Sequence, residues 1–233
     1  MSNSMNCEAG FRHELKYLCS TGEYMVLRDR AQSVMARDSH VCHDEGYLIR
    51  SIYFDDPYNS CYYANEDGVT PREKWRIRSY DLNGDYLLLE CKRKEHDMIR
   101  KSSCRISHDE FEKLLIGIPI ITGESLIKRF SVLQQTYLMK PSVMVEYMRL
   151  PYVFPQGNVR LTFDYNISSS IEFPGFFSSD IYRRPALARG EQLVEVKFDE
   201  YIPDFLYHLI QLTNMRQITF SKYCICRRHY GFF

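Results

Sequence analysis

The stretch EKWRIRSY, residues 73–80, decides the fold class of this chain. In it the apolar residues Trp75 and Ile77 alternate with the cationic residues Lys74, Arg76 and Arg78. Successive side chains of a β-strand point to opposite faces of its sheet. The stretch therefore predicts a strand with one apolar face and one positively charged face.

The same alternation recurs in other stretches of the chain. Apolar and polar residues alternate in YLLLECKRK (86–94), VRLTFD (159–164) and VEVKF (194–198). The charged residues of these stretches that share a polar face are Glu90, Lys92, Lys94, Arg160, Asp164, Glu195 and Lys197. The pattern of EKWRIRSY is thus a property of several strands and not of one.

Two arrangements account for this pattern. Plain amphipathic strands would bury their apolar face and expose the charged face to water. A closed barrel would instead pack its apolar outer face against helices and line its interior with Arg, Lys and Glu. Charges inside a barrel are costly unless something pairs with them, and a polyanion with a divalent cation would do so. The periodicity alone leaves both arrangements open.

The remaining segments are typical of an α+β protein. Helices are predicted over 20–36, 107–115, 124–139 and 203–213. Strands are predicted over 11–19, 47–55, 72–80, 85–94, 97–105, 142–149, 158–165, 192–198 and 218–223. Because strands and helices do not alternate regularly, an antiparallel sheet or barrel is favoured. No repeat or Pro/Gly-rich linker divides the chain, which predicts a single domain over residues 1–233.

The composition argues against some function classes. Lys and Arg together number 30, as do Asp and Glu, so the formal net charge is zero. Nucleic-acid-binding proteins that rely on bulk electrostatics are normally basic, so no nucleic-acid partner is expected. No apolar run approaches the roughly 18–20 residues that cross a bilayer, and residues 1–10 lack the core of a signal peptide. We expect a cytoplasmic protein without a membrane span, and leave tethering by a membrane partner open.

The eight cysteines are irregularly spaced and do not indicate a disulfide framework. Two clusters, HVCH (40–43) and CICRRH (224–229), contain residue types that bind zinc, but neither has the usual spacing of two residues between cysteines. We expect reduced thiols and assign no zinc site.

Eight motifs, taken in order, carry a family resemblance. They are RHELKYL (12–18), RSIYFDD (50–56), EKWRIRSY (73–80), LECKRK (89–94), VEYMRLPY (145–152), VRLTFD (159–164), VEVKF (194–198) and FSKY (220–223). In this order they resemble the VTC domain, the polyphosphate-polymerase branch of the triphosphate tunnel metalloenzymes, also called the CYTH superfamily. The resemblance extends over about residues 11–226, nearly the whole chain.

The resemblance implies a fold and a set of site residues. The fold would be a closed antiparallel β-barrel tunnel of about eight strands, flanked by helices, that binds ATP and polyphosphate. Basic side chains and Mn²⁺ or Mg²⁺ would hold the triphosphate. Motif positions imply phosphate contacts by Lys16, Arg76, Arg78, Lys92, Arg149, Arg160 and Lys222, with Lys101 and Lys197 as further candidates. They also imply Glu195 as the main metal ligand and Glu90 as a second acidic candidate.

One position departs from the wider superfamily. The hydrolase and cyclase branches begin with an ExExK motif whose glutamates help to hold metal. Here the matching stretch RHELK has Arg12 where the first glutamate would stand. Because arginine cannot bind a metal ion, this departure favours the polymerase branch over a triphosphatase.

The sequence therefore predicts an ATP-dependent polyphosphate polymerase that transfers the γ-phosphate of ATP to a growing chain. The sequence has no P-loop and no evident Ser/His/Asp or Cys/His arrangement. Neither is required, because the terminal phosphate of an acceptor chain is already an anionic nucleophile. Two alternatives stay open: a triphosphatase of the same fold, and a non-catalytic module that binds polyphosphate.

Overall fold

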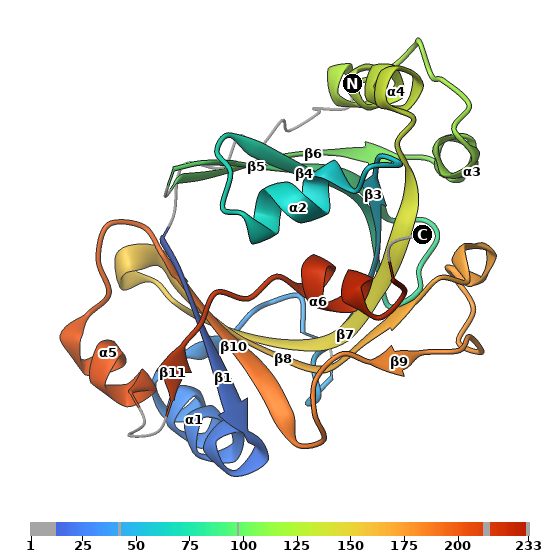
Figure 1. The fold of residues 1–233 in the computed structure, drawn as a ribbon. Coiled ribbons are helices and arrows are strands. Elements are labelled where there is room, and N and C mark those ends of the chain that lie inside the picture. The colour runs from blue at the N-terminus through green and yellow to red at the C-terminus, as the bar shows by residue number, and fades with distance from the viewer. Residues whose placement is uncertain (1–12, 42, 97, 212–214, 232–233) are drawn as a thin grey trace, which may run out of the picture.

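The computed structural model of the chain describes residues 13–41, 43–96, 98–211 and 215–231. It is an α+β fold built on one strongly curled sheet (Figure 1). Its strands are β1 (His13–Ser20), β2 (Ala36–Arg37), β3 (Tyr47–Asp55), β4 (Arg72–Tyr80), β5 (Leu87–Glu95), β6 (Met98–Ile106), β7 (Lys140–Phe154), β8 (Val159–Ser170), β9 (Arg184–Pro185), β10 (Glu191–Phe198) and β11 (Arg216–Gln217). Its helices are α1 (Thr21–Val34), α2 (Ser60–Glu66), α3 (His108–Ile116), α4 (Ser125–Tyr137), α5 (Asp204–Ile210) and α6 (Lys222–Arg228), with short 3₁₀ turns η1 (Gln156–Asn158) and η2 (Phe173–Gly175).

The sheet is antiparallel throughout, but it does not close into the expected barrel. Its strand order is β11-β1-β10-β8-β7-β3-β4-β5-β6, with β2 beside β7 and β9 beside β8. Within the described residues, the outermost strands β11 and β6 do not pair with each other, so the sheet is a half-barrel. The prediction of a closed barrel was wrong because β11 is only two residues long and the chain then enters α6. An ion pair of 3.1 Å between Lys92 of β5 and Glu14 of β1 links the two ends of the curl instead.

Most predicted elements are present, with differences of a few residues at their ends. The exception is 218–223, predicted as a strand, where Lys222 in fact begins α6. The Ser221 hydroxyl caps the N-terminus of this helix by accepting a hydrogen bond from the Cys224 N–H. Tyr223, Cys224 and Cys226 are the buried residues of the helix. The predicted helix 203–213 ends at Ile210, and residues 212–214 lie outside the described part of the chain.

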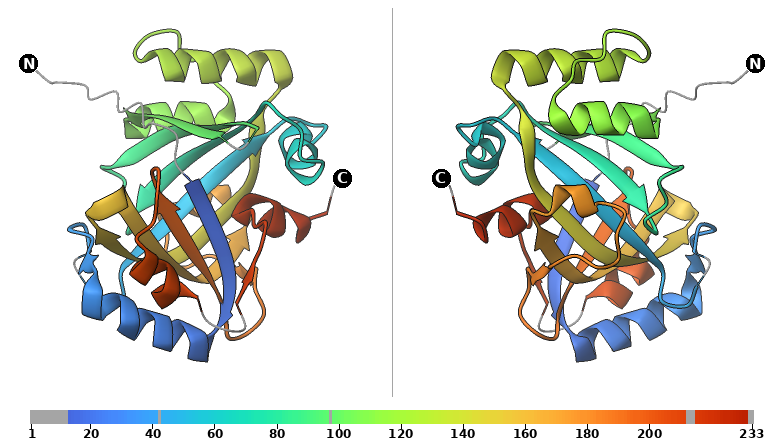
Figure 2. Two further views of the ribbon diagram at one scale, coloured as in Figure 1. Left: turned by 90° about the vertical axis from the view of Figure 1, so that its left-hand side faces the viewer. Right: turned by 90° about the vertical axis from the view of Figure 1, so that its right-hand side faces the viewer.

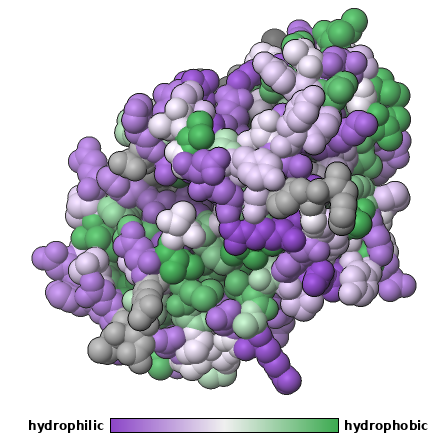
Figure 3. Space-filling view, in the orientation of Figure 1, coloured by the Kyte–Doolittle hydropathy of each residue, from purple (hydrophilic) through white to green (hydrophobic). Residues whose placement is uncertain are grey.

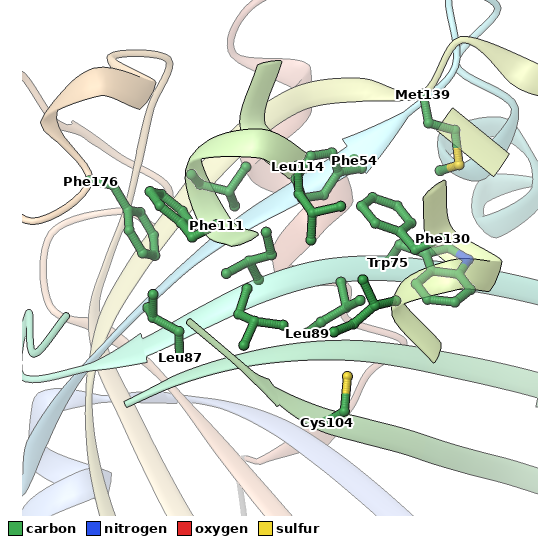
Figure 4. Packing of buried hydrophobic residues seen from close by; sticks show 14 of the residues in the cluster. Phe54, Trp75, Leu87, Leu89, Cys104, Phe111, Leu114, Phe130, Met139 and Phe176 are labelled. Carbon is green, nitrogen blue, oxygen red and sulfur yellow. The ribbon is translucent and has the colours of Figure 1, made fainter. Parts of the chain in front are cut away.

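The apolar outer face of the sheet is covered by helices, as the alternation predicts. Trp75 and Leu89 pack under α3 and α4, where the Trp75 ring stacks on Phe130 with centroids 5.0 Å apart (Figure 4). A second cluster joins α1 and α5 to β7, β8 and β10. The two helix pairs lie at opposite ends of the molecule (Figure 2). These four helices therefore cover the outer face, while the inner face holds the polar residues and a third apolar cluster that packs against α6.

Two short helices lie on the inner side of the sheet. Figure 1 shows α6 within the curl beside α2, and Tyr223 of α6 donates to Asp55 at the end of β3. The six described cysteines are free thiols, and Cys7 and Cys42 lie outside the described residues. None of the described helices combines the length and apolarity needed to cross a bilayer. Ile116, the last residue of α3, and Ile118 and Ile121 after it are exposed. Figure 3 shows hydrophobic surface at the upper right, the corner of the molecule where Figure 1 places α3 and α4.

Candidate functional site

The inner face of the curled sheet encloses a cavity of about 770 Å³. Among the described residues, twelve Lys and Arg side chains line it, but only two carboxylates, Glu14 and Glu195. The basic residues are Lys16, Arg72, Lys74, Arg76, Arg78, Lys92, Lys94, Lys101, Arg149, Arg160, Lys197 and Lys222. Low-dielectric walls concentrate the field of these charges, so the cavity attracts polyanions.

Strand register brings the cations of β4, β5 and β6 side by side. Lys74 lies opposite Lys92, and Lys92 lies opposite Lys101, so three lysines form one row across three strands. Arg78 is 6% exposed, which shows that the polar face of EKWRIRSY points into the molecule. Of the two arrangements that the periodicity left open, the charged interior is therefore the one present.

Glu90 pairs with cations of β4 and β6 on the same inner face of the sheet. Its carboxylate is 1% exposed and accepts from Arg76 Nε at 2.6 Å, while Lys101 pairs with its other oxygen. Burial alone would raise the pKa of Glu90, but Arg76, Arg78 and Lys101 lower it below its usual range. These contacts hold three cations of the cavity in position.

Two carboxylates organise the opposite wall, built by β1, β7, β8, β10 and α6. Asp164 is fully buried and receives two hydrogen bonds from Arg149, of 2.7 and 2.6 Å. Lys222 Nζ lies 2.6 Å from both Asp164 Oδ2 and Glu195 Oε1. Burial would raise the pKa of Glu195, but Lys222, Lys197, Lys16 and Arg149 hold it well below its ordinary value. Glu195 is therefore ionised at neutral pH.

Glu14 is the site residue that the sequence reasoning missed. It faces the cavity and pairs with Lys16 at 3.0 Å and with Lys92 at 3.1 Å. Burial would raise the pKa of Glu14, but these lysines and Lys197 lower it. The signal was present in HELK, where Glu14 and Lys16 share the period-two face. Arg12, two residues before it, lies outside the described residues.

Glu14 and Glu195 are the carboxylates of the cavity that could contribute ligands to a metal ion. The described residues contain no group of three or more His, Cys, Asp or Glu side chains able to hold an ion. Glu14 and Glu195 lie on paired strands, with Lys16 opposite Glu195 and Lys197 opposite Glu14. Mg²⁺ and related hard cations are commonly held by one or two carboxylates together with phosphate oxygens and water. This donor set fits such an ion beside a bound triphosphate.

The crowded cations predict a strong response to polyanions. Tripolyphosphate should raise the melting temperature, because it binds the folded cavity and relieves repulsion between like charges. The shift should shrink as NaCl rises from about 0.05 to 0.5 M, since ionic contacts are screened. Differential scanning fluorimetry measures both effects, with equal ionic strength of sodium sulfate as the control. A shift that is absent, or the same at all salt concentrations, would contradict the cavity as an anion site.

The comparisons with known proteins agree with this geometry. The family model of the VTC domain matches residues 11–230. No curated protein matches the chain. Among solved structures, the chain is similar to HpAC1 from Hippeastrum, a candidate adenylyl cyclase described as revealing a dominant triphosphatase activity, with TM-score 0.51, 12% identity and coverage of 87% of this chain and 84% of that chain.

Two further solved structures resemble the chain more distantly. PH1819 from Pyrococcus horikoshii OT3 has TM-score 0.45 and 16% identity, and covers 85% of this chain and 84% of its own. The inorganic triphosphatase NE1496 has TM-score 0.34 and 13% identity, with 97% of each chain covered. Because the family model of the VTC domain spans nearly the whole sequence, the chain belongs to the VTC domain family, and it shares its fold with HpAC1.

Proposed function

We propose that the protein is a polyphosphate polymerase that transfers the γ-phosphate of ATP to a growing polyphosphate chain. The observation that carries the proposal is the row Lys74, Lys92 and Lys101, three basic side chains in register on adjacent strands. Like charges directly opposite each other destabilise a sheet. Such a row is therefore expected where a bound polyanion compensates it.

In this proposal the cavity cations bind and orient phosphates. Phosphoryl transfer requires mainly positioning and charge neutralisation, which Arg and Lys provide. Arg76, Arg78 and Arg149 present planar donors suited to phosphate oxygens. The remaining contacts are assigned to Lys16, Lys92, Lys101, Arg160, Lys197 and Lys222, all of which line the cavity. Glu90 and Asp164 pair with several of these cations.

Glu195, with Glu14, would hold a divalent ion such as Mn²⁺ or Mg²⁺. When bound, the ion would neutralise charge on the phosphate oxygens. Lys197 and Lys222 already contact Glu195, at 3.3 and 2.6 Å. If Glu195 held such an ion, these lysines would lose their carboxylate partner and could pair with phosphate oxygens instead.

The proposal assigns no proton transfer to the carboxylates of the cavity. Glu14 and Glu195 pair with lysines, and the pKa of each lies below its ordinary value although burial opposes this. An acceptor phosphate chain is already anionic and needs no general base. The products formed from ATP separate this reaction from that of a triphosphatase of the same fold.

Incubation with ATP and Mn²⁺ tests the proposal directly. We expect ADP and chain-length-resolved polyphosphate on a gel, in greater amount than free phosphate. The control is the same reaction with excess EDTA, which should stop both products. Accumulation of free phosphate alone would identify a triphosphatase. Metal-independent binding of polyphosphate without turnover would identify a binding module.

A further inference from the structure

The amine of Lys74 has neutral partners, whereas five other lysines of the cavity pair with carboxylates. Lys16, Lys92, Lys101, Lys197 and Lys222 each form an ion pair with a carboxylate. Lys74 Nζ instead donates to Asn65 Oδ1 of α2 and to Ser221 Oγ, the latter at 3.0 Å. Within the described part of the chain, no carboxylate pairs with it. Its amine is thus held by neutral groups that an anion can replace.

The surroundings of Lys74 are positively charged on several sides. It lies opposite Lys92 in the sheet, and the aromatic ring of Tyr223 lies 6.0 Å from its amine. Burial, together with Lys92, Lys16 and Arg72, lowers the pKa of Lys74 to about 7, with Cys224 acting in the other direction. The titratable or charged groups on the elements around it include Arg72 and Arg76 of β4, Lys92 of β5, Lys16 of β1, Cys61 of α2, and Lys222, Tyr223 and Cys224 of α6. Asp55, at the end of β3, is also near, and its carboxylate accepts hydrogen bonds from Tyr223 and from the Cys61 and Tyr62 N–H groups, not from Lys74. An anion at this place would therefore meet an amine that has no competing carboxylate.

We propose that Lys74 is a further phosphate-binding residue, at the end of the cavity bounded by α2 and α6, and that it gains a proton from solvent when phosphate binds. The ligand class rests on the proposed function. An anion stabilises the protonated amine against its cationic neighbours, so binding and proton uptake are linked. When an anion binds, the Lys74 amine can exchange its hydrogen bonds to Asn65 and Ser221 for bonds to the anion. Because Asn65 and Ser221 are neutral, this exchange leaves no buried charge without a partner. Lys74 is therefore more fully protonated when an anion occupies the cavity than when the cavity holds none.

Isothermal titration calorimetry with tripolyphosphate tests this inference. Titrations are run at pH 7.5 with EDTA, in two buffers of different ionisation enthalpy, which gives the number of protons taken up. Lys74→Arg keeps a permanent charge, so it should bind within about threefold of wild type but take up fewer protons. Lys74→Met should bind about tenfold more weakly, the loss of one charge-assisted hydrogen bond, and also take up fewer protons. Because Lys92, with a pKa of about 8, also titrates in this range and interacts with Lys74, the Lys74 variants are compared in a Lys92→Arg background as well, where residue 92 keeps its charge.

The matched control is Lys113→Met. Lys113 lies on α3, pairs with Asp109 at 2.6 Å and does not line the cavity, so this variant should match wild type in affinity and proton number. If Lys74→Arg takes up as many protons as wild type, or Lys74→Met binds as tightly, the inference is overturned and the proposed function stands. If wild type does not bind tripolyphosphate at all, the proposed function fails as well.

Discussion

Replacing Glu195 by glutamine is expected to lower metal-dependent turnover by about 10²–10³-fold, if the ion that it holds stabilises charge in the transition state. Glutamine keeps the size of the side chain but loses the charge that a divalent ion requires. Tripolyphosphate binding without metal should be retained or become tighter. The reason is that Lys222, Lys197 and Arg149 all contact Glu195 and would lose a competing anion.

Steady-state rates with ATP and Mn²⁺, and metal-free titration of tripolyphosphate, separate these two effects. Glu112→Gln is the control, because Glu112 lies exposed on α3 and does not line the cavity. It should leave both quantities unchanged. Full activity in Glu195→Gln would show that Glu195 is not a metal ligand. Loss of metal-free binding would mean that Glu195 organises the cavity and does not act through an ion.

Replacing Asp164 by asparagine is expected to lower the free energy of unfolding by about 3–5 kcal/mol, as for other buried ion pairs that lose one partner. Asp164 is 0% exposed, and its carboxylate contacts both Arg149 and Lys222. The variant leaves these two cations without their shared anion. Tripolyphosphate should restore part of the lost stability, because both cations line the cavity and can pair with phosphate.

Urea unfolding with and without tripolyphosphate measures the loss and its recovery. Asp109→Asn is the control, because the exposed pair that Asp109 forms with Lys113 should contribute about 1 kcal/mol or less. Burial would raise the pKa of Asp164, but Arg149 and Lys222 lower it below its usual 3.8. Its contribution is therefore present above that pH and is lost as the pH falls further. The difference in free energy of unfolding between wild type and Asp164→Asn should therefore become smaller at acidic pH. Equal losses in Asp164→Asn and Asp109→Asn would contradict the role of Asp164.

The sequence by itself determined which face of each strand is charged. Alternation with a period of two is a local property, so Trp75 and Leu89 could be assigned to the core and Arg76 and Lys92 to the opposite face. The same reasoning extended to β8 and β10, where Arg160 and Lys197 line the cavity. Helix starts at Ser20 and Ser107 were also readable, because a capping box lies within four consecutive residues.

Only the tertiary structure decided what the charged faces surround. The curl stays open because β11 is short, and the choice of helix over strand after Ser221 depends on the burial of Tyr223 against β3 and β7. Glu14 and Glu90 are alike in sequence pattern, yet Glu14 lines the cavity, whereas Glu90 is buried among the side chains of Arg76, Arg78 and Lys101. The environment of a carboxylate is set by neighbours that are remote in sequence, as in the pairing of Glu14 with Lys92 across the interior. Side-chain alternation specifies a direction from the backbone, whereas the charges met in that direction depend on how distant strands are brought together.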